Sequence, residues 1–188
     1  MTDFRVIGDI GLTLKALLDQ DELWTDISQK PDITFQSPKE IKEDSDSTGN
    51  PNKISLFLYH IEVNPHLRNE DLIRVNDSGF MQPPLPLYLY YLVTPYGNNK
   101  TDEHYILGKV MQIFYDNPRL MGSILQNSLK ESDEEFKLLF STISLDDLYK
   151  VWDAFQDVAF RLSVGYMVTP IRIVSAKETT KVQRVIES

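Results

Sequence analysis

The chain has 188 residues, 41% of them hydrophobic and 25% charged, and it contains no cysteine. This length fits one domain with a sizeable core, and the composition is that of an ordinary soluble globular protein. The lack of cysteine excludes thiolate catalysis, zinc–cysteine sites and disulfides, and it fits a reducing compartment. The net charge of −9 disfavours nucleic-acid binding, because the densest basic stretch, residues 177–184, has only three basic side chains.

The first part of the chain predicts a helix followed by short elements. Its start lacks the basic region and cleavage site of a secretory signal, so we expect a chain that folds in the cytoplasm. The helix carries an apolar stripe of Ile7, Ile10, Leu14, Leu17 and Leu18. Thr2 or Asp3 can cap it. Residues 33–38 predict a brief strand, and residues 39–53 predict a polar, mobile loop.

Two segments predict strands with apolar side chains on both faces. In residues 54–63, period two places Ile54, Leu56 and Leu58 on one face and Phe57, Tyr59, Ile61 and Val63 on the other. Residues 85–93, inside "PPLPLYLYYLVTPYG", place a leucine-rich face toward the core and Tyr88, Tyr90 and Leu92 on the opposite face. No apolar run reaches the ~20 residues of a membrane-spanning helix, so we expect no membrane contact. Residues 64–84 predict a long connection.

The second half alternates helices and strands without a regular βαβ rhythm. It predicts a helix over 104–117, a second helical piece over 118–129 and a strand over 136–143. Ser144, with Asp147 three positions later, predicts the start of a further helix. Residues 160–174 predict a long strand with an edge or a bulge at Pro170. We expect one α+β domain with a mixed or mostly antiparallel sheet flanked by helices.

The chain offers little catalytic chemistry. His60 and Glu62 share a strand face, but no third metal ligand is indicated. The stretch "DSDSTG" imitates the start of a calcium loop, yet Ser55 stands where the bidentate glutamate belongs. Glu62 is the one carboxylate in an apolar run, and phosphate-loop, nucleophile-elbow and zincin motifs are missing. We therefore expect no catalytic residues, no metal and no cofactor.

Four segments, taken in order, carry a family resemblance. They are "LFLYHIEVNPHLRN", "PPLPLYLYYLVTPYG", "YILGKVMQIFYDNPRL" and "SLDDLYKVWDAFQDVAFRLSVGYMVTPIRI". Together they resemble the cap, or tail-terminator, proteins of extracellular contractile injection systems of the antifeeding-prophage and virulence-cassette type. The resemblance implies a homohexameric ring that binds the inner tube and the last sheath layer, and it implies no catalysis.

The resemblance divides the chain into a cap domain over residues 1–174 and an extended C-terminal arm over 175–188. Candidate interface residues are Tyr88 and Tyr90 on the strand, Arg68 and Arg74 in the long connection, and Val182 and Ile186 as anchors of the arm. The arm can add as a strand to a neighbouring sheet edge or be a frayed terminus. Two alternatives remain open: a baseplate or sheath-associated adaptor of the same kind of particle, and a small cytoplasmic enzyme.

Overall fold

A six-stranded sheet forms the centre of the computed structural model, which describes residues 2–27, 29–44, 49–67, 71–76, 79–177 and 180–181. The strand order is β1-β2-β5-β8-β7-β6. In that order the strands span Asp32–Thr34, Lys53–Val63, Leu85–Tyr96, Val164–Ile173, Glu135–Ser141 and Arg119–Met121. β1 and β2 are parallel, whereas the other neighbours are antiparallel. This confirms the predicted α+β class.

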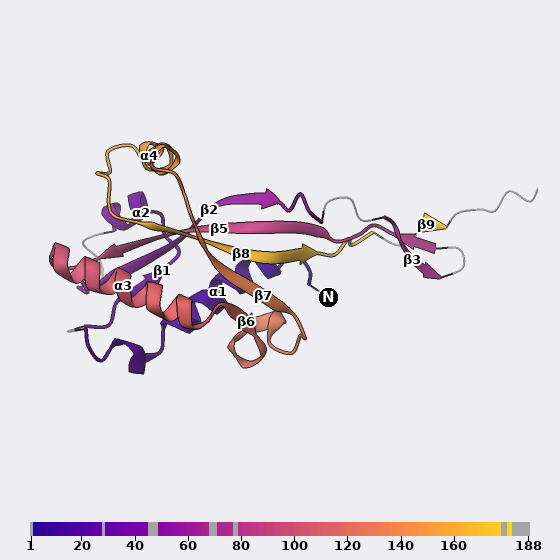
Figure 1. The fold of residues 1–188 in the computed structure, drawn as a ribbon, viewed down its shortest axis with the longest axis horizontal. Coiled ribbons are helices and arrows are strands. Elements are labelled where there is room, and N and C mark those ends of the chain that lie inside the picture. The colour runs from indigo at the N-terminus through magenta and orange to yellow at the C-terminus, as the bar shows by residue number, and fades with distance from the viewer. Residues whose placement is uncertain are drawn as a thin grey trace, which may run out of the picture.

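The helices form a layer on each side of this sheet (Figure 1). α1 (Val6–Leu18) and α3 (Lys100–Asp116) lie on one face, while α2 (Pro38–Glu43) and α4 (Leu145–Asp153) lie on the other. Three short 3₁₀ turns complete the body: η1 (Asp21–Trp24), η2 (Gly122–Ile124) and η3 (Asn127–Leu129). The main core lies between the sheet and the α1–α3 layer, and a smaller core lies beneath α4.

The central strand β5 separates these two cores. Leu87, Leu89 and Val93 point into the main core, and Leu92 packs with Trp152 of α4 in the smaller one. This alternation is what period two predicts for a strand that is covered on both faces. The predicted two-faced strand is therefore confirmed, with Leu89 and Leu92 both fully buried.

A β-bulge in β2 changes the predicted pattern of that strand. The pairing with β5 shifts between Leu58 and His60, so Tyr59 is an extra residue. Beyond the bulge Ile61 and Val63 fall on the face of Leu58, so their predicted placement with Tyr59 is wrong. The two-sided cover also ends there, because Ile61 is 41% exposed.

Residues 118–129 do not form one continuous helical piece, because only two short 3₁₀ turns within them are helical. They form β6, which pairs with β7, and then the turns η2 and η3. Gly122 and Asn127 have positive φ angles of 62° and 50°, which a continuous α-helix excludes. Leu120 is buried in the main core beside Phe136, its partner on β7. The apolar spacing that suggested a helix therefore comes from a short strand followed by turns.

Two helix starts also differ from the sequence-based expectation. The segment predicted as a polar loop begins with α2, where Ser37 and Glu40 form a capping box. The N-cap of α1 is Arg5, without a side-chain cap, whereas Asp3 accepts a hydrogen bond from the Arg5 amide at 2.9 Å. The predicted cap by Thr2 or Asp3 is therefore wrong.

The predicted start of α4 is confirmed by its cap. Ser144 is the N-cap, and its Oγ accepts a hydrogen bond from the Asp147 amide at 3.1 Å. We expect Ser144→Ala to lower the free energy of unfolding by about 1 kcal/mol, because the first turn loses a partner for one amide. Urea unfolding measures this change, with Ser144→Thr as a control that keeps the hydroxyl. An unchanged midpoint for Ser144→Ala would show that the cap adds nothing.

The predicted bulge at Pro170 is present within β8. Between the pairs Leu87–Ile171 and Leu89–Val168, two β8 residues oppose one β5 residue. Pro170 lies in this irregular stretch, where the ladder does not need its missing amide. β8 is nevertheless a central strand, between β5 and β7.

A second, three-stranded sheet extends from the body (Figure 1). β3 (Ile73–Asn76) and β4 (Gly79–Met81) form a hairpin within the predicted long connection. β9 (Thr180–Lys181) pairs antiparallel with β4. The beginning of the C-terminal segment thus adds a strand to a hairpin of its own chain.

Candidate assembly surfaces

On the α4 side, part of the large sheet is not covered by any helix of the described residues: the sheet extends past α4 (Figure 1). Register places His60 of β2, Tyr90 of β5, Met167 of β8 and Leu139 of β7 in one row across this surface. Leu92 of β5 packs under α4, and Tyr90 lies two residues nearer the start of the strand. We call this surface the open face and define it by His60, Glu62, Tyr88, Tyr90, Met167 and Leu139.

Aromatic contacts order the β2–β5 half of the open face. The Tyr90 ring centroid lies 5.4 Å from that of His60, 6.2 Å from that of Tyr88 and 6.3 Å from that of Tyr59. Tyr90 Oη also donates a hydrogen bond to Glu62 at 3.1 Å. The rings are thus held in place before any partner arrives, which lowers the entropic cost of binding. The surface combines apolar ring faces with polar tips, as protein interfaces often do.

The predicted interface residues fall in three places. Tyr88 and Tyr90 lie together on the open face, as the pattern of β5 indicated. Arg74 lies in β3, paired with Phe80 of β4. Arg68, Val182 and Ile186 lie outside the described residues, and so does most of the calcium-like stretch.

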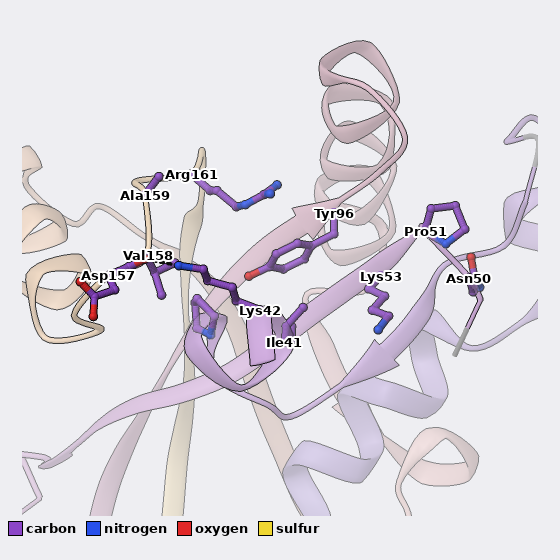
Figure 2. A pocket seen from close by; sticks show the side chains of 11 residues that line it. Ile41, Lys42, Asn50, Pro51, Lys53, Tyr96, Asp157, Val158, Ala159 and Arg161 are labelled. Atoms are coloured by element: carbon purple, nitrogen blue, oxygen red, sulfur yellow. Dashed lines mark hydrogen bonds between the residues drawn. The ribbon is translucent and has the colours of Figure 1, made fainter. Parts of the chain in front are cut away.

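A charged cavity lies at the other end of β5 (Figure 2). It has a volume of about 420 Å³, and α2, the start of β2, the end of β5 and residues 157–161 contribute to its lining. Lys42, Lys53 and Arg161 bring three cations to it, and Tyr96 presents its ring. Lys42 Nζ donates a hydrogen bond to the Asp157 carbonyl.

A buried carboxylate holds the arginine of this cavity in place. Arg161 Nη1 donates to Glu103 at 2.8 Å, and the Glu103 side chain is 8% exposed. The Arg161 guanidinium carbon also lies 4.6 Å from the centre of the Tyr96 ring, within cation–π range. These contacts fix Arg161 between two partners, so its charge is positioned at the cavity wall.

The Tyr96 hydroxyl is buried without a hydrogen-bond partner among the described residues. Burial raises the pKa of Tyr96 to about 12, although the charge of Arg161 acts in the opposite direction. An unpartnered buried hydroxyl is unfavourable by ~1–3 kcal/mol. The cavity beside it combines cationic side chains with an apolar lining that includes Ile41 and Val158.

Sequence reasoning missed this cavity. Its lining comes from four separated segments, and a lysine, an arginine and a tyrosine in such segments look like ordinary surface residues. Arg161 carried the strongest signal, because it follows Phe160 immediately before a buried strand. No spacing rule links it to Glu103, which is 58 positions away.

Tyrosine burial predicts a loss of stability in alkali. The pKa values of Tyr90, Tyr96 and Tyr166 are each raised to about 12, with burial as the main cause. Unfolded tyrosine titrates near ~10, so these side chains favour folding fully below that pH. Their contribution is lost as pH rises from about 10 to about 12.

Tyr166→Phe tests this dependence, because it removes one such hydroxyl from the main core and keeps the ring that packs edge-on to Phe114. In urea unfolding at pH values from 8 to 11.5, we expect the variant to lose stability less steeply above pH 10 than the original chain. Parallel curves for the two proteins would contradict the assigned cause.

Two kinds of feature are absent from the part of the chain that the structure describes: a metal-ligand cluster and a membrane-spanning helix. The described residues include no group of three or more potential ligands from His, Cys, Asp and Glu. They also include no helix with the length and apolarity to cross a membrane. Glu62, the carboxylate singled out from the sequence, lies on an exposed stretch of β2 and bonds to Tyr90.

Comparison with known proteins places the chain in a family. The family model described as the Pvc16 N-terminal domain matches residues 9–187. Because this match spans nearly all of the sequence, the chain belongs to that family. The comparison with curated proteins finds no match.

Two solved structures share the fold. One is the sheath/tube terminator of the extracellular contractile injection system PVC in its extended state, with a TM-score of 0.62 and 19% identity. The other is the anti-feeding prophage cap, a tube-terminating cap, with a TM-score of 0.59 and 16% identity. Each alignment covers 100% of this chain but only 62% and 60% of those chains. The chain thus spans less than two thirds of the length of either structure.

Proposed function

We propose that this chain is a non-enzymatic structural cap that terminates the inner tube and sheath of a contractile injection system. The observation that carries this proposal is agreement over the whole chain: the family match covers residues 9–187, and both terminator structures align with all of it. The role needs extended surfaces for partners rather than a catalytic pocket. The open face and the projecting small sheet supply such surfaces.

The proposed assembly is a ring of six copies seated on the distal end of the tube. The open face is the candidate contact with another subunit or with the tube, through Tyr88 and Tyr90. The β3–β4 hairpin with β9 stands away from the body (Figure 1), so it is placed to reach a neighbour, and Arg74 belongs to it. Residues 1–174 serve as the cap domain and 175–188 as the arm. The particle assembles in the cytoplasm and is then released.

Binding to tube ends tests this role. Purified chain, labelled with gold, is mixed with tubes and with contracted sheaths of the same system and imaged by electron microscopy. We expect label at a single end of the tube, opposite the baseplate. Label along the whole tube, or at the baseplate, would contradict termination and would favour an adaptor.

Removing residues 176–188 tests the arm. We expect the truncated chain to fold, because the large sheet and both cores lie before residue 176, and to bind tube ends more weakly. Binding equal to that of the complete chain would assign the segment no role in assembly.

A further inference from the structure

We propose that the charged cavity beside Tyr96 receives the acidic segment 131–135 of a neighbouring copy, and that this contact closes the ring. The inference rests on the proposed ring assembly. It starts from the uneven charge of the molecule. The chain carries 28 acidic against 19 basic residues, yet Lys42, Lys53 and Arg161 converge on one cavity.

Part of this positive charge has no partner among the residues that the structure describes. Arg161 is paired with Glu103, and Lys42 bonds to a carbonyl oxygen. Among the described residues, no carboxylate pairs with Lys53. Figure 2 shows Lys53 and Lys42 on either side of the Tyr96 ring. A carboxylate that enters this cavity meets the two lysines of its lining.

The same chain carries a complementary segment. Residues 131–135, "ESDEE", hold four carboxylates in five positions that follow η3 and end at Glu135, the first residue of β7. Glu131 and Asp133 are exposed, whereas Glu135 forms a long pair with Arg119 at 3.5 Å. The segment is short and accessible, so it is suited to insertion into a neighbour's cavity.

The two features lie at opposite corners of the large sheet. Lys53 begins β2, beside the edge strand β1, and it pairs with Tyr96 at the end of β5. The acidic segment leads into β7 beside the other edge strand, β6, and enters it at the end where β5 begins. A head-to-tail contact needs two different patches on opposite sides of one subunit. Because the cavity and the acidic segment lie on opposite sides of the same subunit, we assign the cavity to the acidic segment of a second copy of this chain.

Charge reversal in two separate variants tests the contact. Lys53→Glu makes the cavity less positive, and the double variant Glu131→Lys/Asp133→Lys makes the segment basic. We expect each protein alone to form rings at least tenfold less readily than the original chain, by sedimentation velocity, because like charges then meet. In an equal mixture, the less positive cavity of one variant meets the basic segment of the other, and the unchanged cavity meets the unchanged acidic segment. Opposite charges then meet at every interface of an alternating ring, so we expect ring formation to return to within threefold of the original.

Lys39→Glu is the matched control. Lys39 lies on α2 near Lys42, is exposed and does not line the cavity, so the same charge change should leave the rings intact. Circular dichroism confirms folding of each variant before assembly is measured. Higher salt should weaken the original ring, since the contact is electrostatic.

The outcomes separate this contact from the function on which it rests. A wild-type chain that forms no ring and does not bind tube ends overturns the proposed function. Normal rings from both charge-reversed proteins, a mixture that fails to recover, or an equal loss with Lys39→Glu overturns the contact alone. Normal rings from Lys53→Glu that no longer bind tube ends would also overturn it, because the acidic occupant would then belong to another protein.

Discussion

Replacing Tyr88 and Tyr90 together with serine is expected to weaken assembly at least a hundredfold while the chain still folds. Aromatic residues at the centre of an interface typically contribute ~2 kcal/mol or more each when truncated. Both side chains lie on the open face, and neither belongs to a buried core cluster. Sedimentation and tube-end binding measure the loss, and urea unfolding checks stability.

A second pair of tyrosines provides the control for this variant. Tyr105 and Tyr115 on α3 are 61% and 85% exposed, on the opposite side of the sheet. Their replacement by serine removes the same number of exposed rings, and we expect assembly to be unchanged. Tyr90→Phe separates the ring from the hydroxyl bound to Glu62, and we expect a loss of less than threefold. Equal losses from both tyrosine pairs would argue against a specific open-face contact.

Replacing Asp9 with alanine is expected to lower the free energy of unfolding by about 3 kcal/mol. Asp9 is buried on α1 and holds η3 to the body. It accepts hydrogen bonds from Asn127 Nδ2 at 3.1 Å, from the Ser128 amide at 3.2 Å and from the Ser128 hydroxyl. Alanine leaves these donors without their acceptor in a partly buried place. The hydrogen bond from Asn127 to Asp9 also stabilises the positive φ angle of Asn127, a backbone conformation that is unfavourable for most residues.

Asp3→Ala is the matched control for Asp9→Ala, at the start of the same helix. Asp3 pairs with Arg5, but both side chains are largely exposed, so we expect little change in stability. Urea unfolding of the two variants makes the comparison. A loss below about 1 kcal/mol for Asp9→Ala would show that η3 is held by packing of Leu125 and Leu129 instead.

The sequence predicted those elements whose pattern comes from their own packing. β5 is recognisable because its leucines alternate with tyrosines, which places most of its leucines on the core face and Tyr88 and Tyr90 on the opposite face. α4 is recognisable because Ser144 caps it, and α3 because five of its apolar residues reach the main core. Met111 of α3, by contrast, is 36% exposed and does not belong to that core.

The errors arise where distant residues decide the local structure. Residues 119–121 have apolar spacing compatible with a helix, but their pairing with β7 makes them a strand. The bulge at Tyr59 places the following residues on the opposite faces from those predicted, and no residue type within β2 indicates a bulge. The hairpin β3–β4 is completed by β9, about 100 positions later in the chain. The local sequence pattern of residues 64–84 therefore predicts only a long connection.

The candidate surfaces could be predicted only in part for the same reason. Tyr88 and Tyr90 were identified because they alternate with core residues within one strand. The cavity was not, since Lys42, Lys53, Tyr96 and Arg161 come together only after the sheet and its helices have packed. Residues that meet through tertiary structure leave no local periodicity to find.

Particle length is the most direct test of whether this chain terminates a tail. Particles are assembled with and without it, and the lengths of their tubes and sheaths are measured by electron microscopy. A terminator predicts a narrow length distribution with the chain and broken or widely variable tails without it, with recovery when the chain is supplied again. Tails of normal, uniform length in its absence would contradict the terminator role.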